Sequence, residues 1–217
     1  MMRKRSQILE IIHTAFENND YPGDEYLIGS LEGGEPLDEV NPFIGQNDWR
    51  SISPGLLDSH PGALNFFSEA GLRFFLPAYL VADMRDQLKI ADPVFPLVHG
   101  FSNLSIPQEI RSRVYIRKTG RDAFINPKRY GALTFYDYSR YRLSIFSREE
   151  AQAIVAYLEN KRGNDPGGLE AEQIEAALIS FWYGRAQKAP DAQSIHAHLQ
   201  DEAKYLDQLF NHPNFDL

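Results

Sequence analysis

The chain has 217 residues, of which 43% are hydrophobic and 24% are charged, and its net charge is −8 at neutral pH. This length and composition are typical of one compact globular domain rather than of a disordered chain. Cysteine is absent, which excludes disulfides, zinc ribbons, iron–sulfur clusters and thiol nucleophiles. The negative charge argues against nucleic-acid binding by the surface as a whole.

The N-terminal segment indicates an amphipathic helix rather than a targeting sequence. Apolar residues at helical spacing run from Ile8 to Phe16, and Ser6 is the predicted N-cap. Glu10 and His13 interrupt this apolar run, so the segment lacks the core of a signal peptide. No apolar stretch approaches the ~20 residues that a membrane helix needs. We therefore expect a cytoplasmic protein without a membrane partner.

The region up to residue 89 predicts a long connection followed by two helices. Residues 20–48 are rich in glycine, proline and acidic residues, and we expect them to form a surface loop. A short helix is predicted over residues 63–67, ending by Gly71, because glycine is favoured just after a helix. Pro77 suits the first position of a helix, so the next helix is expected to begin there.

The middle of the chain carries the weakest secondary-structure signal. Prolines interrupt residues 90–146, and only residues 113–117 and 133–138 alternate in the manner of short strands. We therefore predict a mainly α fold in which residues 110–146 have room for a few short strands. An α+β fold is the alternative.

The last third of the chain indicates helices throughout. A capping box at Ser147–Glu150 precedes an apolar helical stripe, and glycines between residues 163 and 168 end that helix. Two further helices are expected after it. We therefore divide the chain into a main body, residues 1–168, and a C-terminal helical pair, residues 169–217, packed on it within one compact domain.

An aromatic–leucine–proline–alanine–tyrosine run, Phe74 to Tyr79, is the most distinctive stretch of the sequence. It occurs together with Ala15-Phe16, Tyr21-Pro22-Gly23-Asp24, Trp49 and the residues 63–67. This combination resembles an uncharacterised family of small bacterial proteins, and the resemblance covers about the first half of the chain. It implies a bacterial, cytosolic origin, and it implies no activity.

The common motifs of catalysis and cofactor binding are absent from the sequence. We find no phosphate-binding loop, no dinucleotide-binding glycine pattern, no nucleophile elbow and no zincin motif, so no cofactor is expected. His196 and His198 stand two residues apart in a predicted helix. Side chains at that spacing point about 200° apart, so the pair is not expected to bind a metal ion.

The residues from Arg111 to Arg142, which we call the basic stretch, stand out against the acidic background. They include nine basic residues, seven phenylalanines or tyrosines and two acidic residues. Arginines interleaved with aromatic residues are typical of surfaces that bind proteins, or phosphates and bases. The alternative is a basic segment packed internally against an acidic body. The candidate binding residues are Arg111, Arg113, Arg117, Arg121, Arg129, Tyr130, Arg140 and Arg142.

We expect a non-enzymatic binding protein whose basic stretch is exposed and contacts a protein partner or a second copy of the chain. A nucleic acid or a phosphate ligand is the less favoured partner. The alternative is an enzyme with a loop-built site around His60, His99 and residues 73–85, since loop histidines can act as general bases. The candidate pocket residues of this alternative are Arg73, Tyr79, Asp83 and His99.

Overall fold

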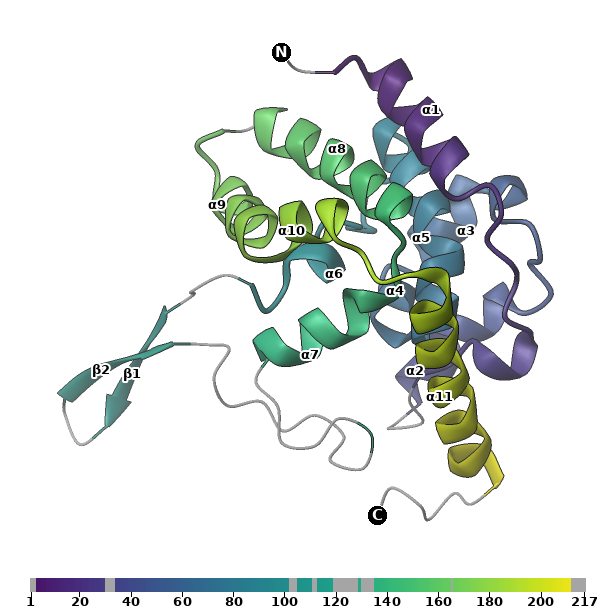
Figure 1. Ribbon diagram of the computed structural model, residues 1–217. Helices are drawn as coiled ribbons and strands as arrows, with labels where there is room; N and C mark the ends of the chain where they lie inside the picture. The colour runs from purple at the N-terminus through teal and green to yellow at the C-terminus, as the bar shows by residue number, and fades with distance from the viewer. Residues whose placement is uncertain are drawn as a thin grey trace.

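The structure, a computed structural model, is mainly helical, as the sequence predicts (Figure 1). It describes residues 3–29, 34–101, 105–110, 113–118, 129, 135–164 and 166–211, with the backbone alone for 105–110 and 113–118. The helices are α1 (Arg5–Ala15), α2 (Glu35–Val40), α3 (Pro54–Ser59), α4 (Ala63–Phe66), α5 (Glu69–Met84), α6 (Phe95–Val98), α7 (Phe135–Arg142), α8 (Arg148–Asn164), α9 (Leu169–Ala177), α10 (Tyr183–Gln187) and α11 (Ala192–Asn211). Shorter helical turns are η1 (Asp24–Tyr26), η2 (Asn41–Phe43), η3 (Trp49–Ser51), η4 (Leu143–Ile145) and the π-helical η5 (Leu178–Trp182).

Helix α5 lies at the centre of the molecule, with α1, α3, α4 and α11 packed against it (Figure 1). Its sequence is apolar on every side, and nearly all of its 16 residues are buried. A helix that is apolar all round has no face for solvent, so other elements have to cover it. The long helix α8 packs on α1 from the neighbouring layer.

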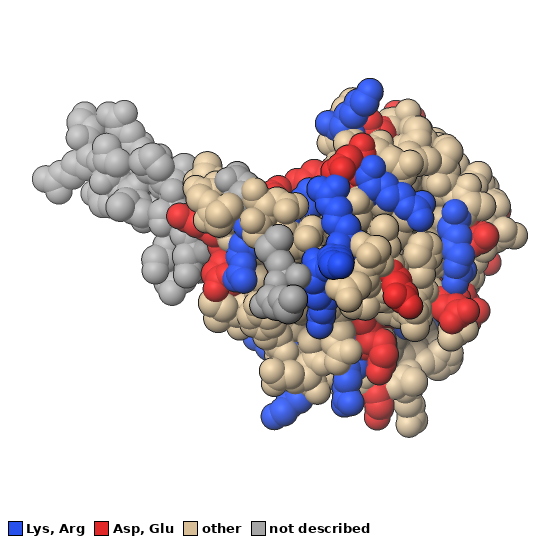
Figure 2. Space-filling model, turned by 90° about the horizontal axis from the view of Figure 1, so that it is seen from above, with Lys and Arg blue, Asp and Glu red and all other residues tan. Residues whose placement is uncertain are grey.

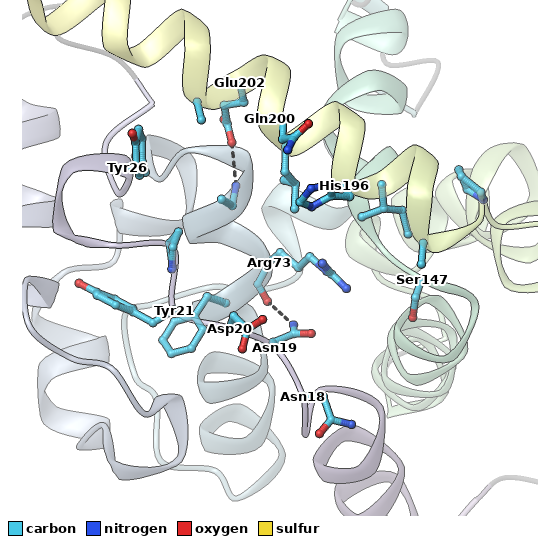
Figure 3. A pocket seen from close by; sticks show the side chains of 18 of the residues that line it. Asn18, Asn19, Asp20, Tyr21, Tyr26, Arg73, Ser147, His196, Gln200 and Glu202 are labelled. Carbon is cyan, nitrogen blue, oxygen red and sulfur yellow. Dashed lines mark hydrogen bonds between the residues drawn. The ribbon is translucent and has the colours of Figure 1, made fainter.

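Pro77 lies inside α5, so the prediction that a helix begins there is wrong. A proline within a helix lacks the N–H that would bond the carbonyl four residues earlier, which here belongs to Arg73. The side-chain amide of Asn19 donates to that carbonyl at 3.1 Å (Figure 3). The loop after α1 therefore supplies the hydrogen bond that the proline removes, and the helix continues.

Gly71 also lies inside α5, not at the end of the preceding helix as predicted. A Cβ atom at this position would lie 3.1 Å from the carbonyl oxygen of Leu27 and 3.2 Å from Oγ of Ser68. The close approach of the segment around Leu27, rather than a helix end, therefore favours glycine here. The residues 20–48 are not all surface loop either, because Val40 and Phe43 are fully buried in the core.

The capping box that opens α8 is confirmed by its two hydrogen bonds. The backbone N–H of Ser147 donates to the carboxylate of Glu150 at 2.6 Å, and the backbone N–H of Glu150 donates to Oγ of Ser147 at 3.2 Å. At the other end of the chain, α9, η5 and α10 form a continuous helical run beside α8, whereas α11 packs on η4 and α5. The domain boundary near residue 168 stays a prediction.

A two-stranded antiparallel hairpin pairs β1 (Ser105–Ile110) with β2 (Arg113–Lys118). β2 matches the strand predicted over residues 113–117. The strand predicted over residues 133–138 is wrong, because Phe135 begins α7. The buried positions of α7 are Ser139 and Arg142, three residues apart. Because both residues are polar, a search for apolar residues at helical spacing does not detect this helix.

Asn19→Ala should lower the free energy of unfolding by about 1–2 kcal/mol, because a partly buried carbonyl loses its donor. Pro77→Ala restores a backbone N–H near the same carbonyl, so Asn19→Ala should cost less in that background. Urea denaturation of the wild type, both single variants and the double variant measures this coupling. An equal cost of Asn19→Ala in both backgrounds would contradict the account.

Candidate functional site

The structure describes the side chains of three of the eight candidate binding residues in the basic stretch, namely Arg129, Arg140 and Arg142. Arg140 is exposed and lies over the ring of Tyr136 at 5.4 Å. Arg142 is buried, and its guanidinium donates to backbone carbonyls of Leu64 and Phe67 at 2.8 and 3.1 Å. Arg142 therefore supports the fold and is not part of an exposed surface. The side chains of the others lie outside the described residues: Arg111, Arg113, Arg117, Arg121 and Tyr130.

Arg129 belongs to a buried group of charged residues between α5 and α11. Its side chain is 3% exposed and contacts the carboxylates of Glu69 and Asp201, each at 2.8 Å. Glu69 also lies 2.7 Å from Nε2 of His198, and its backbone N–H donates to the carboxylate of Glu202 at 2.5 Å. We call Glu69, Arg129, His198, Asp201 and Glu202 the docking cluster, because they join α11 to the start of α5.

Glu202 caps α5 from outside that helix. Its two carboxylate oxygens accept the backbone N–H groups of Glu69 and Ala70, which are orphan donors at the first turn of a helix. Burial and the nearby carboxylate of Glu69 raise the pKa of Glu202 to about 8, although the two N–H donors and Arg129 oppose this rise. The hydrogen bonds between Glu202 and the first turn of α5 hold α11 in place, although burial makes ionisation of this carboxyl group unfavourable.

Three of the residues proposed for an alternative pocket lie along α5, and each already has a partner. The guanidinium of Arg73 donates to the carboxylate of Glu150 at 3.0 Å. The hydroxyl of buried Tyr79 donates to the carbonyl of His60 at 3.2 Å. The carboxylate of Asp83 accepts from the hydroxyl of Tyr157 at 2.7 Å and pairs with Lys161. The structure therefore does not bring these three side chains to one place.

The loop histidines of the alternative site pack against aromatic rings. The ring of His99 stacks on Phe95 at 4.7 Å and meets Phe135 edge-on at 5.2 Å, and burial lowers the pKa of His99. The ring of His60 lies edge-on to Phe43 at 6.2 Å. His99 is nevertheless exposed and His60 half-buried, and neither side chain forms a hydrogen bond or ion pair with a described carboxylate.

A cleft lies between α11 and the loop that follows α1 (Figure 3). Its volume of about 890 Å³ is within the usual range of ligand pockets. His196 and Gln200 on α11 lie across the cleft from Arg73 on α5 (Figure 3). The remaining walls come from residues 18–22, residues 147–149 at the start of α8, and residues 189–206.

The cleft combines an apolar lining with an acidic rim. Tyr21 and Leu199 contribute apolar surface, while the exposed carboxylates of Asp20, Glu149 and Asp191 contribute negative charge. These carboxylates come from segments far apart in the chain, so sequence inspection did not group them. The positive charge of Arg73 is compensated by Glu150, and the three exposed carboxylates outnumber the one other arginine of the lining, exposed Arg148.

The face of the molecule seen in Figure 2 carries basic and acidic side chains interspersed with one another. Within the described part of the chain, no group of three or more histidine, aspartate or glutamate side chains is placed to hold a metal ion. None of the described helices has the length and apolar character that crossing a membrane requires.

A model of a protein family of unknown function, DUF6714, matches residues 4–186. The chain belongs to this family. The resemblance to an uncharacterised family is thus confirmed, and it extends beyond the first half of the chain. Neither the curated proteins nor the solved structures include a match. The part matched by the DUF6714 model ends before α11, so the cleft and the docking cluster combine the family body with a helix outside the matched range.

The raised pKa of Glu202 makes one contribution to stability depend on pH. Because the folded pKa of about 8 exceeds the ordinary 4.5, the folded state binds more protons between these values. The contribution of Glu202 to the free energy of unfolding is therefore complete below about pH 4.5 and is lost as the pH rises through 8. Glu202→Gln removes this titration, so its unfolding free energy relative to wild type should increase from pH 5 to about pH 8.5.

Urea denaturation across this pH range measures the difference between the two proteins. Glu149→Gln is the matched control, since Glu149 is an exposed residue on the other wall of the cleft. Parallel pH profiles for the wild type and Glu202→Gln would contradict the assignment of a raised pKa to Glu202.

Proposed function

We propose that the chain is a non-enzymatic binding protein that holds a positively charged segment of a protein partner in the cleft beside α11. The observation that carries this proposal is the combination of the apolar lining with the acidic rim. The cleft takes the place of the basic stretch as the main contact, because Arg129 and Arg142 are bonded internally. Exposed Arg140 remains available for a secondary contact.

The length of the cleft suits an extended peptide segment. The cleft-lining residues of α11 run from Ala192 to Leu206, a rise of about 21 Å along a helix. An extended chain advances up to ~3.5 Å per residue, so about six residues of a partner fit along this wall. Alternate side chains of such a segment would face Tyr21 and Leu199, which line the cleft.

The charge of the rim sets the chemistry of the partner. Asp20, Glu149 and Asp191 are exposed carboxylates around the opening. Complementary charge increases the association rate and suppresses binding of the wrong partners. A segment that alternates apolar residues with lysine or arginine therefore suits the cleft better than an acidic segment.

Among the described histidines, only His196 lines the cleft, and its side chain forms no hydrogen bond or ion pair with a described carboxylate or tyrosine. An enzyme of the predicted kind needs a histidine with a carboxylate or a tyrosine facing a pocket. His198 does lie beside Glu69, but both side chains are largely buried within the docking cluster, and neither lines the cleft. His60 and His99 pack against aromatic rings.

The cellular setting that we propose is the cytoplasm of a bacterium. The absence of cysteine suits a reducing compartment, and the bacterial origin rests on the family resemblance of the sequence.

A panel of fluorescent peptides tests the proposal. The peptides share one alternating apolar scaffold and carry lysine, glutamine or glutamate at the remaining positions. We expect the lysine peptide to bind at least tenfold more tightly than the glutamate peptide, with an affinity that decreases as salt screens the rim. The double variant Asp20→Asn/Glu149→Gln should weaken binding. The matched control is Glu35→Gln/Asp38→Asn, which removes the same charge at exposed residues outside the cleft and should leave binding unchanged.

The site of binding is read from a fluorophore attached to a single introduced cysteine, since the chain has none of its own. Gln200→Cys places the label in the cleft, and Gln208→Cys places it on α11 outside the cleft. The lysine peptide should change only the first signal. Binding that ignores the peptide charge, or that changes both labels equally, would contradict the proposal.

A further inference from the structure

A second pocket lies at the opposite end of α5 from the cleft. Its volume is about 290 Å³, and its walls come from His13 on α1, from residues 49–54 and from residues 78–87. We propose that this pocket binds a small anion through a carboxylate or phosphate group. This site is separate from the cleft and does not depend on the proposed partner binding.

The charge of this pocket is opposite to that of the chain as a whole. Its lining includes the basic residues His13, Arg50 and Arg85, and it includes no aspartate or glutamate. The chain as a whole has 30 acidic and 22 basic residues. The pKa of His13 is lowered by burial and then by the charges of Arg85 and Arg50, which is consistent with a positive potential between the three side chains.

Trp49 holds two of these basic groups in position. Its ring is 2% exposed, and its indole N–H donates to the carbonyl of Phe16 at 3.2 Å. The ring of His13 stacks on it with centroids 5.3 Å apart, and the guanidinium of Arg50 lies 4.7 Å from the ring centre. Groups held in place before binding lose less conformational entropy when a ligand arrives.

The two arginines have N–H donors to offer a ligand. Arg50 donates to the carbonyl of Glu17 at 2.9 Å, and its contact with Asp48 is an exposed one of 3.5 Å, which contributes little. The side chain of Arg85 forms no hydrogen bond or ion pair with the described residues. Its planar donors match the geometry of a carboxylate or a phosphate.

The remaining walls limit the size and nature of the anion. The volume is at the lower end for ligand pockets, so a small molecule is favoured over a nucleotide or a peptide. Ile52, Ala78 and Val81 contribute apolar surface, which suits the carbon skeleton of an organic acid or a phosphorylated metabolite. The C-terminal ends of α1 and α5 bring partial negative charge of roughly half a unit each, which the two full charges of the arginines exceed.

Titration followed by NMR of the Trp49 indole N–H, together with calorimetry, tests this inference on the full chain. The probes are inorganic phosphate, glycerol phosphate, succinate and chloride. We expect saturable binding of a phosphate or a carboxylate probe and a shift of the Trp49 signal, with none for chloride. A response to glycerol phosphate alone assigns the ligand to organic phosphates, and a response to succinate alone assigns it to organic acids.

Two variants connect the binding to this pocket. Arg85→Gln removes a side chain without a partner among the described residues, and should weaken binding at least tenfold. Gln87→Glu introduces a carboxylate at the exposed edge of the pocket. Its negative charge repels the anion, so this variant should also bind the anion more weakly than wild type. Lys204→Gln removes an exposed positive charge on α11 that lines neither this pocket nor the cleft, and it should leave the affinity within twofold of wild type.

The inference fails on any of three results. The first is that no probe shows saturable binding. The second is that Lys204→Gln weakens binding as much as Arg85→Gln, which indicates a general electrostatic effect. The third is that both pocket variants bind with wild-type affinity while retaining a cooperative unfolding transition.

Discussion

Helix α5 is buried on all sides, so each of its polar groups needs a partner from another part of the chain. Glu202 on α11 binds the free N–H groups of its first turn, and Asn19 replaces the hydrogen bond lost at Pro77. Tyr157 on α8 bonds to Asp83 near its end. The surrounding elements are thus positioned by the polar requirements of α5 as well as by its apolar surface.

The two candidate sites follow from this arrangement. The loop at Asn19 and helix α11 are both bonded to α5 and form opposite walls of the cleft. At the other end of α5, the segment around Trp49 bonds to the carbonyl of Phe16, and Arg85 follows the last turn of the helix. One central helix therefore organises an acidic cleft at its beginning and a basic pocket at its end. The DUF6714 match covers the walls of the second pocket completely and those of the cleft only in part.

The sequence predicted the features that depend on neighbouring residues. The capping box of α8 and the mainly helical class are local in origin, and the structure confirms both. The continuation of α5 through Pro77 could not be predicted, because the compensating donor, Asn19, is 54 residues before Arg73, whose carbonyl it bonds. The burial of Arg142 was equally hidden, since its acceptors are the backbone carbonyls of residues 64 and 67. The run Phe74 to Tyr79, on which the resemblance seen in the sequence rested, lies in the buried part of α5.

Amide hydrogen exchange along the chain tests the central role of α5 most directly. The account predicts that the amides in the middle of α5 exchange only on global unfolding and are the slowest in the protein. It also predicts that the N–H groups of Glu69 and Ala70, which bond to Glu202, are protected in the wild type and exchange faster in Glu202→Ala. Exchange of the α5 core before that of α8, or equal exchange of Glu69 and Ala70 in both proteins, would contradict the account.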